Sequence, residues 1–130
     1  MALGISIRDL LRPSGEERTL IRQEEQQLYE YDEYKLQIRR LDFGKKRGIY
    51  EFSTYDPETK DTPPSWGLHP YAEVGVILEG KMEVNLDGTV YLLGPGDSIY
   101  IKPNLYHTMR NAGDTPCRSF WHLQIMDDSV

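Results

Sequence analysis

The sequence predicts an all-β domain, either a sandwich or a barrel, built from short antiparallel strands. From residue 34 onward, segments rich in β-branched and aromatic residues follow one another along the chain. Glycine, proline, asparagine and aspartate separate these segments at short intervals. Short strands at such spacing favour a sandwich or barrel over alternating strand and helix units.

Composition narrows the class of protein further. At 130 residues the chain is long enough to bury one ordinary core. A net charge of −6 disfavours nucleic acid as a direct partner, because phosphate contacts need basic surfaces. Cys117 is the single cysteine, so no intrachain disulfide forms and an oxidising compartment is not implied. With Arg8 and Asp9 interrupting the N-terminal apolar stretch, we expect neither a secretory signal nor a membrane span, and a cytoplasmic location.

The first segment, residues 1–18, is expected to form an N-terminal arm with short helices. Ser6 with Asp9, and Ser14 with Glu17, have the spacing of helix capping boxes, and Pro13 separates the two pairs. The remainder, 19–130, is expected to form the barrel.

The next segment, 19–34, fits two patterns. A weak helical stripe runs through it, but 19–22 and 28–34 also alternate as strands do, and we favour strands. Its acidic residues suit an edge strand, where charge opposes aggregation. Because such a strand can join a partner's sheet as readily as its own, we predict a homodimer.

The remaining strands are expected between well-marked turns. The turn between Leu86 and Thr89 is the clearest, because Asp87 and Gly88 both tolerate the positive φ of a two-residue hairpin. The expected strands lie within 34–43, 48–55, 73–80, 81–86, 89–93, 98–102, 107–111 and 118–126.

Three polar residues are candidates for a shared site inside the barrel. His69 and Glu73 lie four residues apart at the start of one expected strand, and His107 begins another. Alternate side chains of a barrel strand point inward, so these groups can meet although they are distant in sequence. His122 is the remaining histidine, and we expect it to face solvent because Trp121 and Leu123 face the core.

The spacing of these residues resembles the two motifs of the cupin superfamily. His69, Glu73 and Gly80 match the second histidine, the glutamate and the closing glycine of the first motif. Gly67 stands where that motif has its first histidine.

The second motif is matched at its ends and altered in its middle. Gly96, His107 and Asn111 agree with it, whereas Lys102 and Asn104 replace its proline and glycine. Over residues 35–126 the resemblance implies an all-β fold, a single antiparallel jelly-roll (cupin) β-barrel. The order of motifs is also similar to the sensor cupin of helix-turn-helix repressors, although too few residues precede the barrel here for a DNA-binding domain.

The resemblance implies a metal site with ligands His69, Glu73 and His107. Two imidazoles and one carboxylate can hold iron, zinc, nickel or manganese with open coordination positions. The aromatic residues Trp66, Tyr71 and Tyr106 are near these ligands in sequence and are candidates for a small-ligand pocket.

Two kinds of function remain open from the sequence. One is a metal-dependent enzyme, an isomerase, lyase or dioxygenase, acting on a small polar metabolite such as a sugar or organic acid. The other is a non-catalytic sensor that binds such a ligand. No general base can be named from the sequence, which counts against catalysis.

Overall fold

A computed structural model describes residues 17–57, 61–62 and 67–124, and these form an almost entirely β structure. Two single 3-10 turns, η1 (Gln23–Glu25) and η2 (Asp32–Tyr34), flank the first strand. The strands in chain order are β1 Gln27–Tyr31, β2 Leu36–Asp42, β3 Ile49–Tyr55, β4 Glu73–Glu79, β5 Met82–Leu86, β6 Thr89–Leu93, β7 Ser98–Ile101, β8 His107–Asn111 and β9 Cys117–Leu123.

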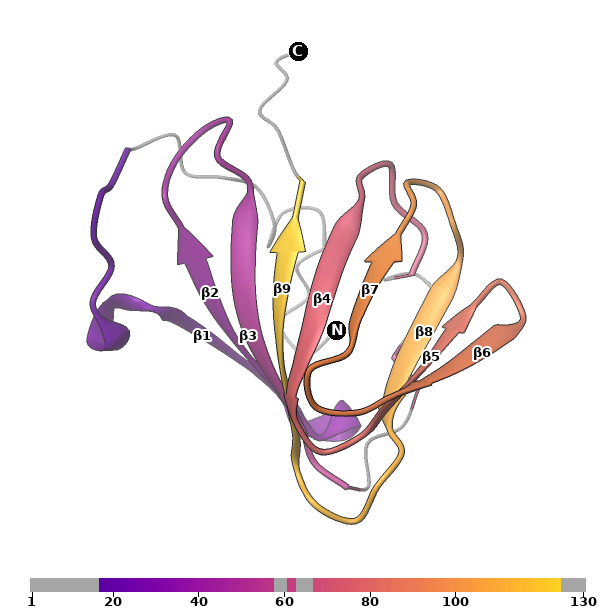
Figure 1. Cartoon of the computed structure of the whole chain (residues 1–130). Coiled ribbons are helices and arrows are strands. Elements are labelled where there is room, and N and C mark those ends of the chain that lie inside the picture. The colour runs from indigo at the N-terminus through magenta and orange to yellow at the C-terminus, as the bar shows by residue number, and fades with distance from the viewer. Residues whose placement is uncertain (1–16, 58–60, 63–66, 125–130) are drawn as a thin grey trace.

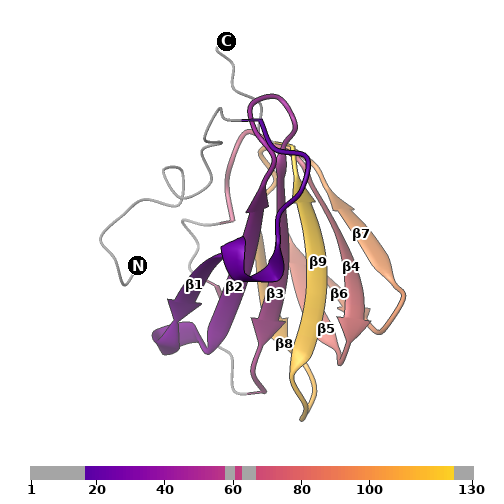
Figure 2. The same cartoon turned by 90° about the vertical axis from the view of Figure 1, so that its left-hand side faces the viewer.

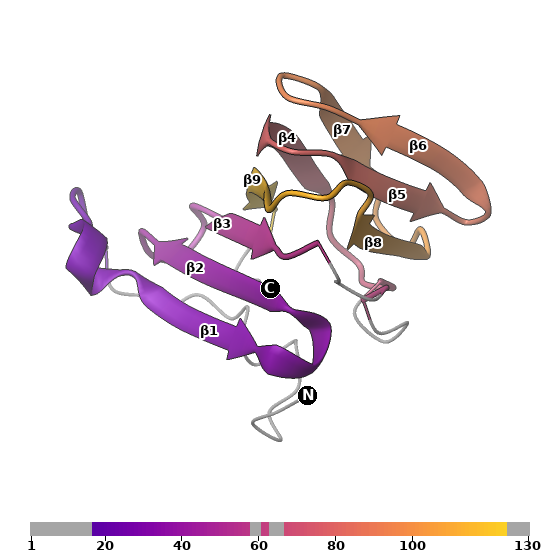
Figure 3. The same cartoon turned by 90° about the horizontal axis from the view of Figure 1, so that it is seen from below.

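The strands form two antiparallel sheets whose inner faces enclose the core (Figure 1). The larger sheet has the order β1-β2-β3-β9-β4-β7 and the smaller has the order β6-β5-β8. Seen from below, β5, β6 and β8 lie beside β4 and β7, whereas β1 and β2 lie at the far end of the large sheet (Figure 3). This arrangement confirms the predicted all-β barrel.

Alternation along the central strands sets which side chains face the core. In β3 the residues Ile49, Glu51, Ser53 and Tyr55 are buried, and the residues between them are only half-buried. In β9 the same pattern buries Trp121 and turns His122 to the outer side, where its ring stacks on Tyr50 at 4.6 Å. Burial of one face of each strand supplies most of the stabilisation of such a sheet.

The N-terminal part differs in detail from the prediction. Only Gln27–Tyr31 of the segment 19–34 forms a strand, and β1 pairs with β2 at the edge of the large sheet (Figure 2). Residues 19–22, expected as a strand, have no strand structure. The helices expected within 1–18 fall on residues 1–16, which lie outside the described part of the chain, so the arm stays a prediction.

The hairpin between β5 and β6 turns as predicted. Asp87 and Gly88 have φ values of 47° and 96°, and Leu86 pairs with Thr89 across the turn. The side chain of Asn85 accepts a hydrogen bond from the Gly88 amide at 2.8 Å. Within the described residues, no helix is long and apolar enough to span a bilayer.

Candidate metal centre

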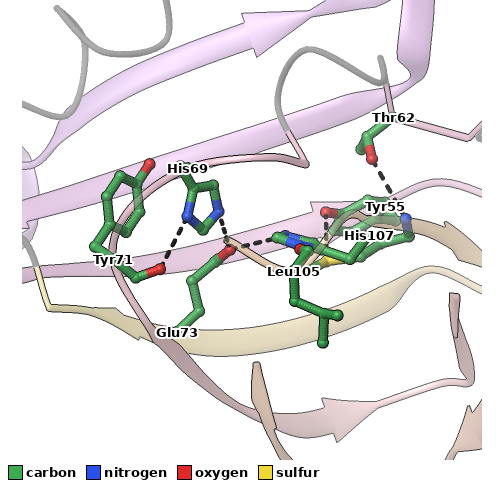
Figure 4. Close-up of polar contacts among 8 residues, drawn as sticks. Tyr55, Thr62, His69, Tyr71, Glu73, Leu105 and His107 are labelled. Carbon is green, nitrogen blue, oxygen red and sulfur yellow. Dashed lines mark hydrogen bonds and ion pairs between the residues drawn. The ribbon is translucent and has the colours of Figure 1, made fainter. Parts of the chain in front are cut away.

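The structure brings His69, Glu73 and His107 together inside the barrel, and we call these three residues the histidine–glutamate cluster. Glu73 is the first residue of β4 and His107 the first residue of β8, while His69 lies in the loop before β4. Nε2 of His69 lies 2.8 Å and Nε2 of His107 lies 2.9 Å from the same carboxylate oxygen, Oε2 of Glu73 (Figure 4). The exposed fractions are 9%, 8% and 4% for His69, Glu73 and His107, so the cluster is shielded from bulk water.

Backbone contacts fix the orientation of both imidazoles. Nδ1 of His69 lies 2.9 Å from the carbonyl oxygen of Tyr71, and Nδ1 of His107 lies 2.9 Å from that of Leu105. A carbonyl oxygen only accepts hydrogen bonds, so each Nδ1 carries a hydrogen and donates it. In a neutral imidazole the other nitrogen then has a lone pair. In that neutral form both Nε2 lone pairs point at the carboxylate of Glu73.

Three lone-pair-bearing atoms in such close contact repel one another unless a positive charge lies between them. Protons on the imidazoles supply that charge in one state, and a metal cation supplies it in another. Backbone carbonyls that hold the Nδ1 hydrogens are the usual support of metal-binding histidines. The donor set of this chain therefore fits a divalent metal.

The pKa values of Glu73 and His107 reflect the same attraction. Burial opposes ionisation of Glu73, but its hydrogen bonds with His107 and His69 outweigh burial and lower the pKa of the carboxyl. Burial likewise opposes the charged form of His107, yet the hydrogen bond to Glu73 and its negative charge raise the pKa of this imidazole. Without a metal, the cluster thus favours a carboxylate paired with a protonated histidine.

Gly67 stands at the position of the missing motif histidine, and with this backbone no side chain fits there. A Cβ atom at Gly67 would overlap the carbonyl oxygen of His107 and lie 2.8 Å from its carbonyl carbon, where 3.4 Å is ordinary contact. The amide of His107 also donates a hydrogen bond to the carbonyl of Gly67 at 2.9 Å. The loop before β4 is therefore fastened to β8, and this contact places His69 opposite His107.

A cavity of about 80 Å³ adjoins the cluster. Its walls come from the large sheet, from β8 and from the loops between β3 and β4, and they combine aromatic rings, hydroxyl groups and aliphatic side chains. The lining residues are Tyr29, Tyr31, Leu36, Ile38, Glu51, Ser53, Tyr55, Thr62, Gly67, His69, Tyr71, Glu73, His107, Met109, Trp121 and Leu123. This mixture can enclose a small ligand that carries several oxygen atoms.

Of the three aromatic residues predicted to line the pocket, the structure places one in the cavity wall and one outside it. Tyr71 lines the cavity and stacks on the ring of His69, with centroids 3.9 Å apart. Tyr106 is 40% exposed and is not among the cavity-lining residues, because it precedes His107 and neighbouring residues point to opposite sides. Trp66 lies outside the described residues.

Glu51 is a buried cavity-lining residue that was not predicted from the sequence. It lines the cavity from β3 and is only 8% exposed. Burial, followed by the negative charge of Glu73, raises the pKa of Glu51 to about 7, while the charge of Arg40 opposes this rise. The alternation of side chains along β3 places Glu51 on the same face as Ile49, and this could have indicated that Glu51 is buried. Tyr50 and Phe52 lie on the opposite face, which is equally apolar in sequence, so the pattern does not tell which face is buried.

Comparison with known proteins agrees with the fold. The profile of the cupin domain matches residues 51–123, more than half of the chain. The chain therefore belongs to the cupin family. A crystal structure of an RmlC-like cupin from Shewanella frigidimarina superposes with a TM-score of 0.69 at 19% identity, covering 89% of this chain and 99% of that one.

Two curated proteins are similar over shorter stretches. Polyketide synthase CurC of Streptomyces cyaneus is 39% identical over 56 residues, which are 42% of this chain and 36% of that protein. Mannose-1-phosphate guanylyltransferase of Escherichia coli K12 is 33% identical over 79 residues, which are 57% of this chain and 16% of that protein. The chain thus matches well under half the length of either relative.

Proposed function

We propose that this cupin binds one divalent metal ion through His69, Glu73 and His107 and holds a small polar metabolite in the adjoining cavity. The observation that carries this proposal is the convergence of Nε2 of both imidazoles on one carboxylate oxygen at 2.8 and 2.9 Å, with each Nδ1 in contact with a backbone carbonyl oxygen. Iron, zinc, nickel and manganese all suit this donor set.

The metal, when bound, would polarise a carbonyl or hydroxyl group of the ligand. The residues of the chain would position the metal ligands and enclose the bound metabolite. Tyr71 supports the ring of His69 by stacking on it, and the other cavity-lining side chains contact the ligand. These features favour an isomerase, lyase or dioxygenase acting on a sugar or organic acid. The similar proteins named for mannose 1-phosphate and for polyketide synthesis support an oxygen-rich ligand.

A second candidate is a non-catalytic cupin that senses such a metabolite. The protonated form of the cluster favours it, because a buried carboxylate paired with a protonated imidazole is a stable arrangement without metal. The resemblance to sensor cupins of helix-turn-helix repressors and the cytoplasmic location stay predictions. A sensor is distinguished by ligand-dependent thermal stabilisation of protein that contains little metal.

Metal analysis of tag-free protein tests the proposal. After incubation with zinc, nickel, manganese or ferrous iron and dialysis, we expect about one ion per wild-type chain and a sharp loss in His107→Ala. His122→Ala is the matched control, because His122 lies on the outer side of β9 and stacks on Tyr50. The nearly isosteric Glu73→Gln repeats the test with little change of volume. Equal metal content in all four proteins would refute the metal site.

A further inference from the structure

A second buried carboxyl, that of Glu51, faces the cavity from the strand on the other side of β9. In the large sheet Glu51 pairs with Trp121 and Glu73 pairs with Leu123, so β9 separates the strands that carry the two carboxyls. Two strand spacings amount to about 10 Å. Both side chains line the same cavity, so a small ligand in that cavity can lie against both.

The packing of Trp121 keeps this space accessible to Glu51. A Cβ atom at Gly75, which pairs with Trp121 on β4, would lie 2.5 Å from the indole ring. The ring therefore leans over Gly75, away from β3. Its Nε1 donates a hydrogen bond to Oγ of Ser119 at 2.8 Å, which fixes the ring in that position.

The charges around Glu51 suit it to exchange protons near neutral pH. Arg40 lies directly across from it on β2, Tyr31 faces it from β1, and Glu73 faces it from β4 with the two imidazoles beyond. Without a metal, burial and Glu73 raise the pKa of Glu51 to about 7, and Arg40 limits the rise. A cation bound at Glu73 would offset the charge of Glu73 and so increase the ionised fraction of Glu51. A carboxyl that is partly ionised at neutral pH can both accept and return a proton.

From this arrangement we propose that Glu51 transfers a proton to and from a small carbonyl compound held between it and the histidine–glutamate cluster. The inference rests on the proposed function and supplies the base that the sequence did not reveal. The ionised carboxylate of Glu51 takes a proton from the carbon next to the carbonyl group. The electron pair of that C–H bond forms a C=C bond, and a carbonyl electron pair moves to oxygen. Return of the proton restores the ligand or gives its isomer, and no oxidant or reductant is consumed.

Hydrogen–deuterium exchange tests this step with hydroxyacetone and pyruvate as probes. Zinc-loaded, tag-free protein is incubated with each probe in D₂O, and the loss of the proton signal next to the carbonyl is followed by NMR. We expect wild-type protein to accelerate exchange of at least one probe and Glu51→Gln to slow it about 100-fold, with zinc content unchanged. Glu79→Gln is the matched control, because Glu79 lies at the far end of β4 and contacts Arg118 on the surface.

A second readout does not depend on activity. In protein with ¹³C-labelled glutamate carboxyls and no zinc, the resonance that disappears in Glu51→Gln is expected to titrate near pH 7. Exchange in Glu51→Gln as fast as in wild type, no exchange of either probe by wild type, or titration of that resonance near 4.5 would each overturn the inference. If one of these results is obtained and wild-type protein binds zinc, the proposed metal site stands and only the role of Glu51 is refuted. If wild-type protein binds no zinc, the metal site and the role of Glu51 are both refuted.

Discussion

Gly67→Ala probes the contact that holds the histidine–glutamate cluster together. The added methyl group would overlap the carbonyl oxygen of His107, and the carbonyl carbon at 2.8 Å is also well inside the ordinary 3.4 Å separation. The obstacle is backbone rather than a flexible side chain, so the loop and β8 have to move apart. That movement breaks the hydrogen bond from the His107 amide to the Gly67 carbonyl.

The size of the effect follows from these two losses. A backbone hydrogen bond contributes about 1 kcal/mol net, and forced overpacking of a buried site costs about 1–3 kcal/mol. We therefore expect the free energy of unfolding to fall by about 2–4 kcal/mol and Tm to fall by about 10 °C. Zinc affinity should fall at least about tenfold, because His69 follows Gly67 by two residues and loses its position relative to His107.

Urea denaturation followed by circular dichroism measures the stability change, and calorimetric titration with zinc measures the affinity. Gly94→Ala is the matched control, because a Cβ atom there would have only Asp97 Oδ2 nearby, at 3.9 Å. This control should unfold at nearly the wild-type urea concentration and keep its zinc affinity. Stability of Gly67→Ala within about 0.5 kcal/mol of wild type, together with unchanged zinc binding, would show that the loop is not held as described.

Three further results are expected. Zinc affinity should rise about tenfold per pH unit for each proton that zinc displaces, and it should level off above the raised pKa of His107. Calorimetric titration at several pH values measures this dependence, and an affinity that does not change with pH would contradict the ligand role of His107. Because Glu51 ionises near 4.5 when unfolded and near 7 when folded, its contribution to stability is full below pH 4.5, and about 3 kcal/mol is lost as pH rises from about 4.5 to 7. Glu51→Gln should remove this loss from urea titrations, although His107 adds a loss of the same sign in both proteins. Light scattering should give a homodimer, and a monomer at tens of micromolar would refute that prediction.

Strand positions were the part of the fold that the sequence predicted best. Segments such as 73–80 and 107–111 alternate and end at glycine, asparagine or aspartate, and both contain strands of the structure. The Asp87-Gly88 turn was predictable because its conformation depends on two adjacent residues. The segment 19–34 was less clear, since an edge strand has one neighbour and its burial pattern is weak.

The cluster was predictable for a different reason. His69, Glu73 and His107 have the spacing of two family motifs, and the structure places all three together. The contacts of Gly67 and the position of Glu51 in the cavity depend on segments far apart in sequence, which no local pattern reveals. In the sequence, a glycine before a strand and a glutamate within a strand are common and indicate no special position. Their significance is seen only from the structure, which places Gly67 against the carbonyl of His107 and Glu51 in the wall of the cavity.

The most direct test of the metal site is a crystal structure of zinc-loaded, tag-free protein with diffraction data collected above and below the zinc absorption edge. We predict one strong anomalous peak inside the barrel, at about 2.0–2.2 Å from Nε2 of His69, Nε2 of His107 and a carboxylate oxygen of Glu73. An interior without such a peak, in crystals grown with zinc in excess, would contradict the account.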